Sequence, residues 1–239
     1  MSRHTGPVGD DAAGSRAGGG ALIELRQVGF AVTSPVPTRI LHPLDLDIAA
    51  GTAVAIIGPS GAGKTTLASL IGALQQPSEG SYRYAGWEMT GRNLGELASF
   101  RSRRLGFVFQ NSHLIDERSA LANVDLGITD PRVPGTDRRR RCWEALDTVG
   151  LAEVAERKAA HLSGGERHRV AVARALVKQP EVVIADEPTA ALDQATGQSI
   201  LDLLSGLTDG GTTLIVVTHD ARAAGMADQV VSVVDGRLT

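Results

Sequence analysis

The residues from Gly58 to Thr66 have the types and spacing needed to hold a chain of phosphates. They fit the phosphate-loop pattern G-x-x-x-x-G-K-[ST] and run Gly58, Pro59, Ser60, Gly61, Ala62, Gly63, Lys64, Thr65, Thr66. Glycines let backbone N–H groups approach phosphate oxygens, and the start of a following helix adds unpaired donors. Lys64 is expected at the β- and γ-phosphates, the Thr65 hydroxyl at Mg²⁺ and Thr66 near the α-phosphate. The segment therefore predicts a nucleoside triphosphate site.

Two carboxylates, Asp186 and Glu187, follow the apolar run Val182–Ala185. A buried parallel strand of this kind places its last residues at the carboxyl edge of a sheet, where α/β proteins bind ligands. Asp186 is therefore a candidate ligand of Mg²⁺, directly or through water. Glu187 is a candidate for polarising the water that attacks the γ-phosphate. Because phosphoryl transfer needs mainly positioning and charge neutralisation, these few groups can suffice.

A third segment, Leu162–Glu166, lies between the phosphate loop and the acidic strand and reads LSGGE. Ser163, Gly164 and Gly165 open a helical segment, so their N–H groups form a second potential anion site. The order of the three segments resembles that of the ATP-binding cassette (ABC) ATPases, in the branch that provides the ATP-binding subunit of transporters.

This resemblance extends from about Ala21 to Thr239. It rests on motifs that stand in the family order: Walker A at Gly58–Thr66, the Q-loop glutamine Gln110, the signature Ser163–Gly165, Walker B at Val182–Glu187, the D-loop Ala190–Asp193 and the switch histidine His219. A lone histidine after a strand is more often structural, but the spacing of His219 after the acidic strand favours the catalytic interpretation.

The resemblance implies a role for each motif. Gln110 would bind Mg²⁺, sense the γ-phosphate and contact a membrane partner. The signature residues would bind the γ-phosphate of ATP held by a second copy of the chain, which implies a homodimer closed around ATP. His219 would hydrogen-bond the γ-phosphate and hold the catalytic geometry. The expected catalytic residues are thus Glu187, His219 and Gln110, and the expected ligands of Mg²⁺ are Thr65, Gln110 and Asp186.

Periodicity predicts an α/β fold with a mainly parallel sheet, because strand patterns alternate with helical ones. Strands are expected at 22–32, 44–48, 54–57, 182–185, 213–218 and 229–234, and helices at 64–74 and 137–149. The resemblance adds a P-loop NTPase core, an N-terminal antiparallel β subdomain and an inserted helical subdomain at about 111–178. Residues 21–239 would form the ABC ATP-binding domain, and residues 1–20, poor in large apolar side chains, are expected to be a disordered tail.

Composition limits the cellular environment and the kinds of partner that fit the protein. The chain has 239 residues, a formal net charge of -3 and one cysteine, Cys142, which is expected to be a small packing residue. No apolar run approaches the roughly 20 residues that span a bilayer. A membrane function is therefore expected to pass through partner subunits. The resemblance implies that the partner is a separate permease and that the protein lies at the cytoplasmic face of the cell membrane.

Two stretches resemble the group of ABC ATPases that serves lipoprotein release, macrolide efflux and antimicrobial-peptide export. They are Glu96–Gln110 and Leu162–Leu176, and Asn111–Asn123 resembles the peptide branches. The group implies that a peptide, lipoprotein or hydrophobic drug is transported. Amino-acid importers and cell-division ATPases share much of these stretches, so they stay open as alternatives.

Other functions fit less well. A soluble ABC ATPase of DNA repair or chromosome maintenance needs a long coiled coil between its halves, and the chain has no heptad run. A translation factor of the superfamily carries two cassettes, whereas this chain has one. An inactive nucleotide-binding scaffold is disfavoured because the candidate site is intact. No nucleic-acid partner is expected, since Arg138–Arg141 is interpreted as a solvated helix face.

The chain departs from the family pattern at the expected adenine contact, where Val32 replaces an aromatic residue. Valine can pack on a base but cannot stack as an aromatic ring does. Phe30, which shares its face of the strand, is the alternative contact. The signature ends in Glu166 rather than glutamine and the D-loop begins with Ala190 rather than serine; neither change removes a catalytic group.

We predict that ATP and GTP are hydrolysed at similar rates if Val32 faces the base. Base–aromatic stacking is worth on the order of 1–3 kcal/mol in nucleic-acid sites, so its absence weakens base discrimination. Val32→Tyr should then tighten ATP binding several-fold in a titration. A strong preference for ATP that Phe30→Ala abolishes would assign the stacking to Phe30, and a preference that neither variant changes would contradict both placements.

Overall fold

The computed structural model describes residues 20–190 and 192–239. The predicted disordered tail, residues 1–20, lies outside the described part except for Gly20. One residue of the D-loop, Ala191, also lies outside it.

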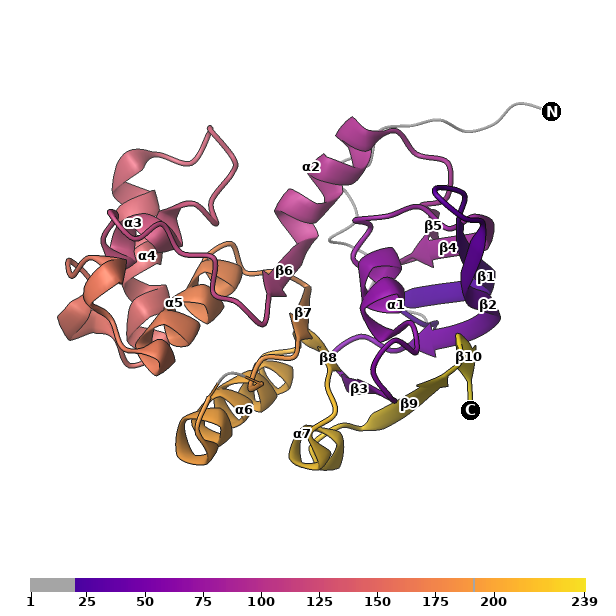
Figure 1. The fold of residues 1–239 in the computed structure, drawn as a ribbon. Helices are drawn as coiled ribbons and strands as arrows, with labels where there is room; N and C mark the ends of the chain where they lie inside the picture. The colour runs from indigo at the N-terminus through magenta and orange to yellow at the C-terminus, as the bar shows by residue number, and fades with distance from the viewer. Residues whose placement is uncertain (1–19, 191) are drawn as a thin grey trace.

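A six-stranded sheet forms the centre of the fold, with the strand order β10–β9–β3–β8–β7–β6 (Figure 1). The strands are β3 Ala53–Ile57, β6 Leu105–Val108, β7 Val182–Asp186, β8 Thr213–Val217, β9 Gln229–Val234 and β10 Arg237–Leu238. All neighbours are parallel except β10 and β9. Val217 pairs with Ile56 on one side and Asp186 on the other, so β3, β8 and β7 end together at one edge.

A second, antiparallel sheet has the order β2–β1–β4–β5. Its strands are β1 Ile23–Val32, β2 Thr38–Ile48, β4 Glu79–Tyr84 and β5 Trp87–Glu88. This sheet shares a buried apolar cluster with the helix α1, Lys64–Ile71, and with one face of the central sheet. The Tyr82 hydroxyl donates a 2.7 Å hydrogen bond to the Ile71 carbonyl, which joins the sheet to the end of α1.

Helices between β6 and β7 form a separate lobe. They are α3 Ala120–Asp125, α4 Gly135–Thr148 and α5 Gly164–Leu176, and Figure 1 shows them on the opposite side of β6 and β7 from α1. Their buried faces share an apolar cluster with the other face of the central sheet. The other α-helices in the described part of the chain are α2 Leu94–Arg104, α6 Gln194–Asp209 and α7 Ala221–Gly225. The helical lobe lies where the inserted subdomain was expected, and the exact domain limits stay a prediction.

The arginine block on α4 is neutralised by carboxylates of the same lobe. The ion pairs are Arg138–Asp125, Arg139–Glu156, Arg140–Asp137, Arg140–Glu144 and Arg141–Asp137. These pairs leave little unbalanced positive charge for a phosphate backbone, in agreement with the interpretation as a solvated helix face.

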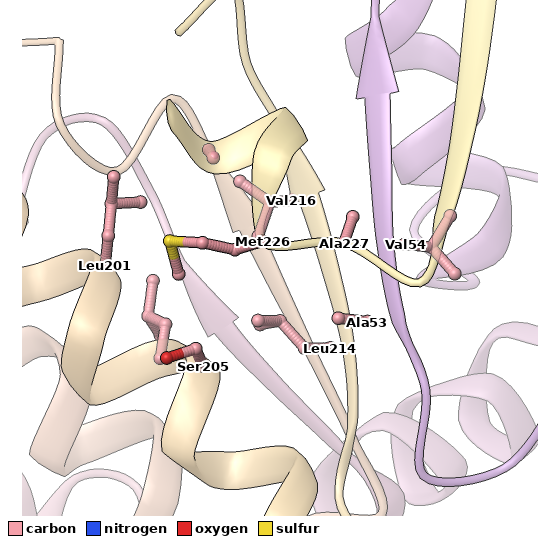
Figure 2. Close-up of a pocket in the computed structure, with 10 residues that line it drawn as sticks. Ala53, Val54, Leu201, Ser205, Leu214, Val216, Met226 and Ala227 are labelled. Atoms are coloured by element: carbon pink, nitrogen blue, oxygen red, sulfur yellow. The ribbon is translucent and has the colours of Figure 1, made fainter. Parts of the chain in front are cut away.

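A small apolar cavity lies between the central sheet and the helices α6 and α7 (Figure 2). It is lined by side chains such as Leu201, Leu214 and Met226, and its volume is about 10 Å³. Because that volume is near the minimum for one water molecule and the walls are apolar, the cavity is a packing defect rather than a ligand site.

The observed elements confirm the predicted α/β fold and adjust its details. The helix after the phosphate loop ends at Ile71 instead of Leu74, and β2 begins at Thr38 instead of Leu44. Sequence reasoning did not place β4, β5, β6, β10, α2, α6 or α7. For α2 a signal was present, because Asn93 and Glu96 form a capping box at its start.

We predict that Cys142 is unreactive in the folded protein. The thiol is buried on α4, and burial, with a smaller contribution from the Asp125 charge, raises its pKa to about 11. Since the thiolate is the reactive form, labelling by a thiol-specific disulfide reagent at neutral pH should be on the order of a hundredfold slower than in denaturant. Rapid labelling of native protein would contradict this packing.

Candidate nucleotide-binding site

The phosphate loop connects β3 to α1 and wraps around the side chain of Lys64. The Nζ atom donates hydrogen bonds to the carbonyl oxygens of Gly58 at 2.9 Å and Pro59 at 3.0 Å. Gly58 has a φ of 145°, and a Cβ atom there would lie 2.0 Å from the Val233 carbonyl oxygen, so only glycine fits. Gly63 precedes α1 without a side-chain cap, which leaves the first N–H groups of the helix open to an anion.

A cavity of about 640 Å³ opens over this loop. It is lined by Ile40, Gly58, Pro59, Ser60, Gly61, Gly63, Lys64, Thr65, Thr66, Gln110, Glu187, Ala190 and His219. The volume is within the usual range of small-molecule sites. All predicted phosphate-loop residues except Ala62, which is buried, contribute to the wall. The three predicted catalytic residues also meet here, although they lie far apart in the sequence.

Asp186 ends β7 next to the phosphate loop, and its Oδ1 atom lies 3.5 Å from the Thr65 hydroxyl. Burial raises the pKa of the Asp186 carboxyl, against the opposing effect of the Thr65 hydrogen bond, and the Glu187 charge raises it further. A bound cation would relieve this cost of desolvation. The hydroxyl, the carboxylate and the Gln110 amide together are hard oxygen donors, so the residues present fit Mg²⁺.

Glu187 follows β7 in a left-handed backbone conformation, with φ at 47°. This is uncommon for a residue other than glycine, and such strain is concentrated at functional sites. The turn directs the carboxylate into the cavity, where both of its oxygens lie 3.0 Å from Nδ1 of His219. Oε1 has hydrogen-bond geometry, whereas Oε2 is buried without a hydrogen-bond partner within the described part of the chain. An unpaired buried oxygen at this point is available to a water molecule.

Gln110 stands two residues after β6 and lines the cavity. Its main-chain carbonyl accepts a 2.9 Å contact from Nε2 of His168, a buried residue of α5. Sequence reasoning missed His168, because a single histidine on an amphipathic helix does not reveal its partner.

The signature residues do not reach the cavity of their own chain. Ser163 caps α5 in a capping box with Glu166: its Oγ accepts from the Glu166 N–H at 3.3 Å, and its own N–H donates to the Glu166 carboxylate at 2.7 Å. Ser163 and Gly164 are exposed, and a Cβ atom on Gly164 would meet nothing within 4 Å. The start of α5 is therefore exposed on the helical lobe, separate from the phosphate loop, and its binding of an anion stays a prediction.

Neither of the two expected contacts for the base, Val32 and Phe30, lines the cavity. Val32 ends β1, is 37% exposed and does not line the cavity, while Phe30 pairs with Leu41 across the sheet. Ile40 lines the cavity instead. It was missed because β2 was expected to begin only at Leu44, and it joins Val32 and Phe30 as a candidate contact.

Comparison with known proteins identifies the family. Residues 41–190 match the family model described as ABC transporter. The chain belongs to the ABC transporter family. This confirms the resemblance and the ABC ATPase class that the motifs predicted, with ATP as the nucleotide.

Relatives in this family include macrolide export proteins. The chain is 43% identical over 221 residues to the macrolide export ATP-binding/permease protein MacB 1/2 of Paracoccus denitrificans, covering 92% of this chain and 33% of that protein. It is 44% identical over 199 residues to the uncharacterized ABC transporter ATP-binding protein YvrO of Bacillus subtilis, covering 83% and 87%. The chain thus spans about a third of the MacB relative and most of YvrO.

Solved ABC cassettes share the fold. A dimeric post-hydrolysis structure of the cassette MJ0796, bound to ADP and Pi, superposes with a TM-score of 0.83 at 36% identity, covering 90% of this chain and 96% of that one. CbiO1 of Clostridium perfringens, part of the transporter complex cbiONQ, gives a TM-score of 0.83 at 28% identity, covering 92% and 87%. These likenesses confirm the predicted fold class.

We predict that Lys64→Ala weakens ATP binding by about tenfold or more, because it removes the buried ammonium that faces the phosphates. Titration with a fluorescent ATP analogue measures the affinity. Lys158→Ala, which removes an exposed lysine outside the cavity, is the matched control and should bind ATP normally. Equal affinities for the two variants would show that the nucleotide binds elsewhere.

Proposed function

We propose that this protein is the ATP-binding and ATP-hydrolysing subunit of a transporter, that it closes as a homodimer around ATP, and that it drives a separate membrane permease. The observation that carries this proposal is the division of the site between two lobes. The cavity over the phosphate loop holds Lys64, Glu187 and His219, while the exposed anion site at Ser163–Gly165 points to no ligand of its own chain. A second copy would complete each site by placing its α5 terminus on the γ-phosphate.

Hydrolysis in this proposal uses the strained end of β7. The Glu187 carboxylate has one oxygen hydrogen-bonded to His219 and a second that lacks a hydrogen-bond partner among the described residues, and it orients and polarises the attacking water. His219 holds that carboxylate and donates toward the γ-phosphate. Lys64 and the N–H groups of the loop and of α1 neutralise the phosphate charge as the terminal phosphoryl group leaves.

Magnesium is proposed as the metal of this site, held by Thr65, Asp186 and Gln110. When bound there, the ion would neutralise charge on the phosphate oxygens. The oxygen chemistry of these donors and the raised pKa of Asp186 support the assignment.

The partner is proposed from the relatives, since the MacB proteins are named as combined ATP-binding and permease chains. Within the described residues, no helix is both long and apolar enough to cross a membrane. A permease on another chain would therefore hold this subunit at the cytoplasmic face of the membrane. The proposed cargo is a hydrophobic drug, a peptide or a lipoprotein.

The DNA-repair alternative gains no support from the fold. Its function would require a long coiled coil, and the longest helix in the described part of the chain is α6, with 16 residues. That length gives little more than two heptads.

We predict that Glu187→Gln abolishes ATP turnover but preserves ATP binding, because the variant loses the water-orienting carboxylate and keeps the phosphate loop. The variant should accumulate as an ATP-bound dimer in gel filtration with light scattering. Glu153→Gln, which changes an exposed residue outside the cavity, should hydrolyse ATP normally and stay monomeric after turnover. Normal turnover by Glu187→Gln, or no dimer with ATP, would contradict the proposed function.

A further inference from the structure

We propose that His168 is a positioning residue that links Gln110 to the signature helix α5. Through this link, the movement of Gln110 toward a protomer's own nucleotide would also place that protomer's Ser163–Gly165 segment on the partner. This inference rests on the proposed function, in which Gln110 contacts the bound nucleotide and the signature acts on the other protomer.

The imidazole of His168 stands between the two motifs. Its Nε2 atom lies 2.9 Å from the carbonyl oxygen of Gln110, and its Nδ1 atom lies 3.2 Å from the carbonyl oxygen of Gly164. Both ring nitrogens face carbonyl oxygens, which only accept hydrogen bonds; we assign the proton to Nε2 because its contact, with Gln110, is the shorter of the two. Only 6% of His168 is exposed, and water therefore competes weakly for this bond.

The same helix holds the segment that follows Gln110. Arg174 donates to the carbonyl oxygens of Ser112 at 2.6 Å and His113 at 2.8 Å, and Arg167 forms a 2.8 Å ion pair with Asp116. Together with His168, these contacts fasten the segment from 110 to 116 to α5 at successive points. Gln110 is the first of them and the one that lines the cavity.

Backbone pairing with the central sheet ends just before this segment. Val108 is the last residue of β6 that pairs with β7, opposite Ala185. Phe109 alone separates this paired residue from Gln110, and its 38% exposed ring stacks on Phe107 at 5.8 Å. The backbone at Phe109 is therefore the point at which the fastened segment can turn relative to the sheet.

These contacts give His168 a role that ordinary packing would not. When Gln110 moves toward the nucleotide over the phosphate loop, the buried hydrogen bond pulls the first turn of α5 with it. That turn carries Ser163 and Gly164, which face outward. Without the bond, Gln110 could approach its nucleotide while the signature stayed behind, so dimer closure would need more ATP.

The test uses the full chain in a Glu187→Gln background, which retains ATP. His168→Met keeps a similar volume but has no donor, and His168→Gln keeps a donor of similar reach. We expect His168→Met to raise the ATP concentration for half-maximal dimerisation by about five- to tenfold, the usual effect of losing one buried hydrogen bond, and His168→Gln to restore it to within about twofold. Affinity for a fluorescent ADP analogue, which has no γ-phosphate, should be unchanged in both variants.

The outcomes distinguish a failure of this inference from a failure of the proposed function. If the Glu187→Gln parent forms no dimer with ATP, the proposed function fails. If the parent dimerises and His168→Met dimerises at the same ATP concentration, the positioning role is wrong. A parallel loss of ADP affinity would show that His168 only maintains the fold, which also overturns the proposal. Should His168→Met not fold, His168→Asn, whose amide is one methylene shorter than that of glutamine, replaces it with the same expected result.

Discussion

The parallel pairing of β3, β8 and β7 is the constraint on which the rest of the structure depends. Because these strands run the same way and end in register, the chain that leaves them meets at one sheet edge. The phosphate loop leaves β3, Glu187 leaves β7 and His219 leaves β8. Apolar side chains bury both faces of β7, with Val183 in one core cluster and Ile184 in the other, so the edge cannot shift without disturbing both cores. The packing that stabilises this sheet therefore also fixes the positions of the charged groups at its edge.

At that edge the molecule keeps groups that folding alone would disfavour. Lys64 is buried on two carbonyl oxygens, the Asp186 carboxyl has a raised pKa, and Glu187 combines a left-handed backbone with an unpaired oxygen. Each feature costs stability in the free protein and is relieved by phosphate, a cation or water. Their concentration at one sheet edge, on and beside the cavity, indicates a site organised for its ligand before the ligand binds.

The helical lobe adds a second requirement, because the start of α5 is exposed and does not line the cavity of its own chain. In the proposed homodimer, each site would be complete only with the second copy, so that ATP binding would favour the closed arrangement. The contacts of α5 with the segment after Gln110 matter for the same reason. In the proposed movement, they make the lobe move together with Gln110 about the backbone at Phe109.

Sequence alone predicted the family, the ATPase class and the α/β fold class. The Gly58–Thr66 pattern, the apolar strand before Asp186 and the order of the motifs predicted an ABC ATPase, because spacing in a loop or at a strand end is local information. Tertiary structure decided what depends on contacts between distant segments. Two of these contacts, between Glu187 and His219 and between His168 and Gln110, join residues 32 or more positions apart. Ile40 lines the cavity because β2 begins earlier than the sequence pattern predicted. Local patterns cannot encode such pairs, since side-chain partners across a fold are set by packing of the whole chain.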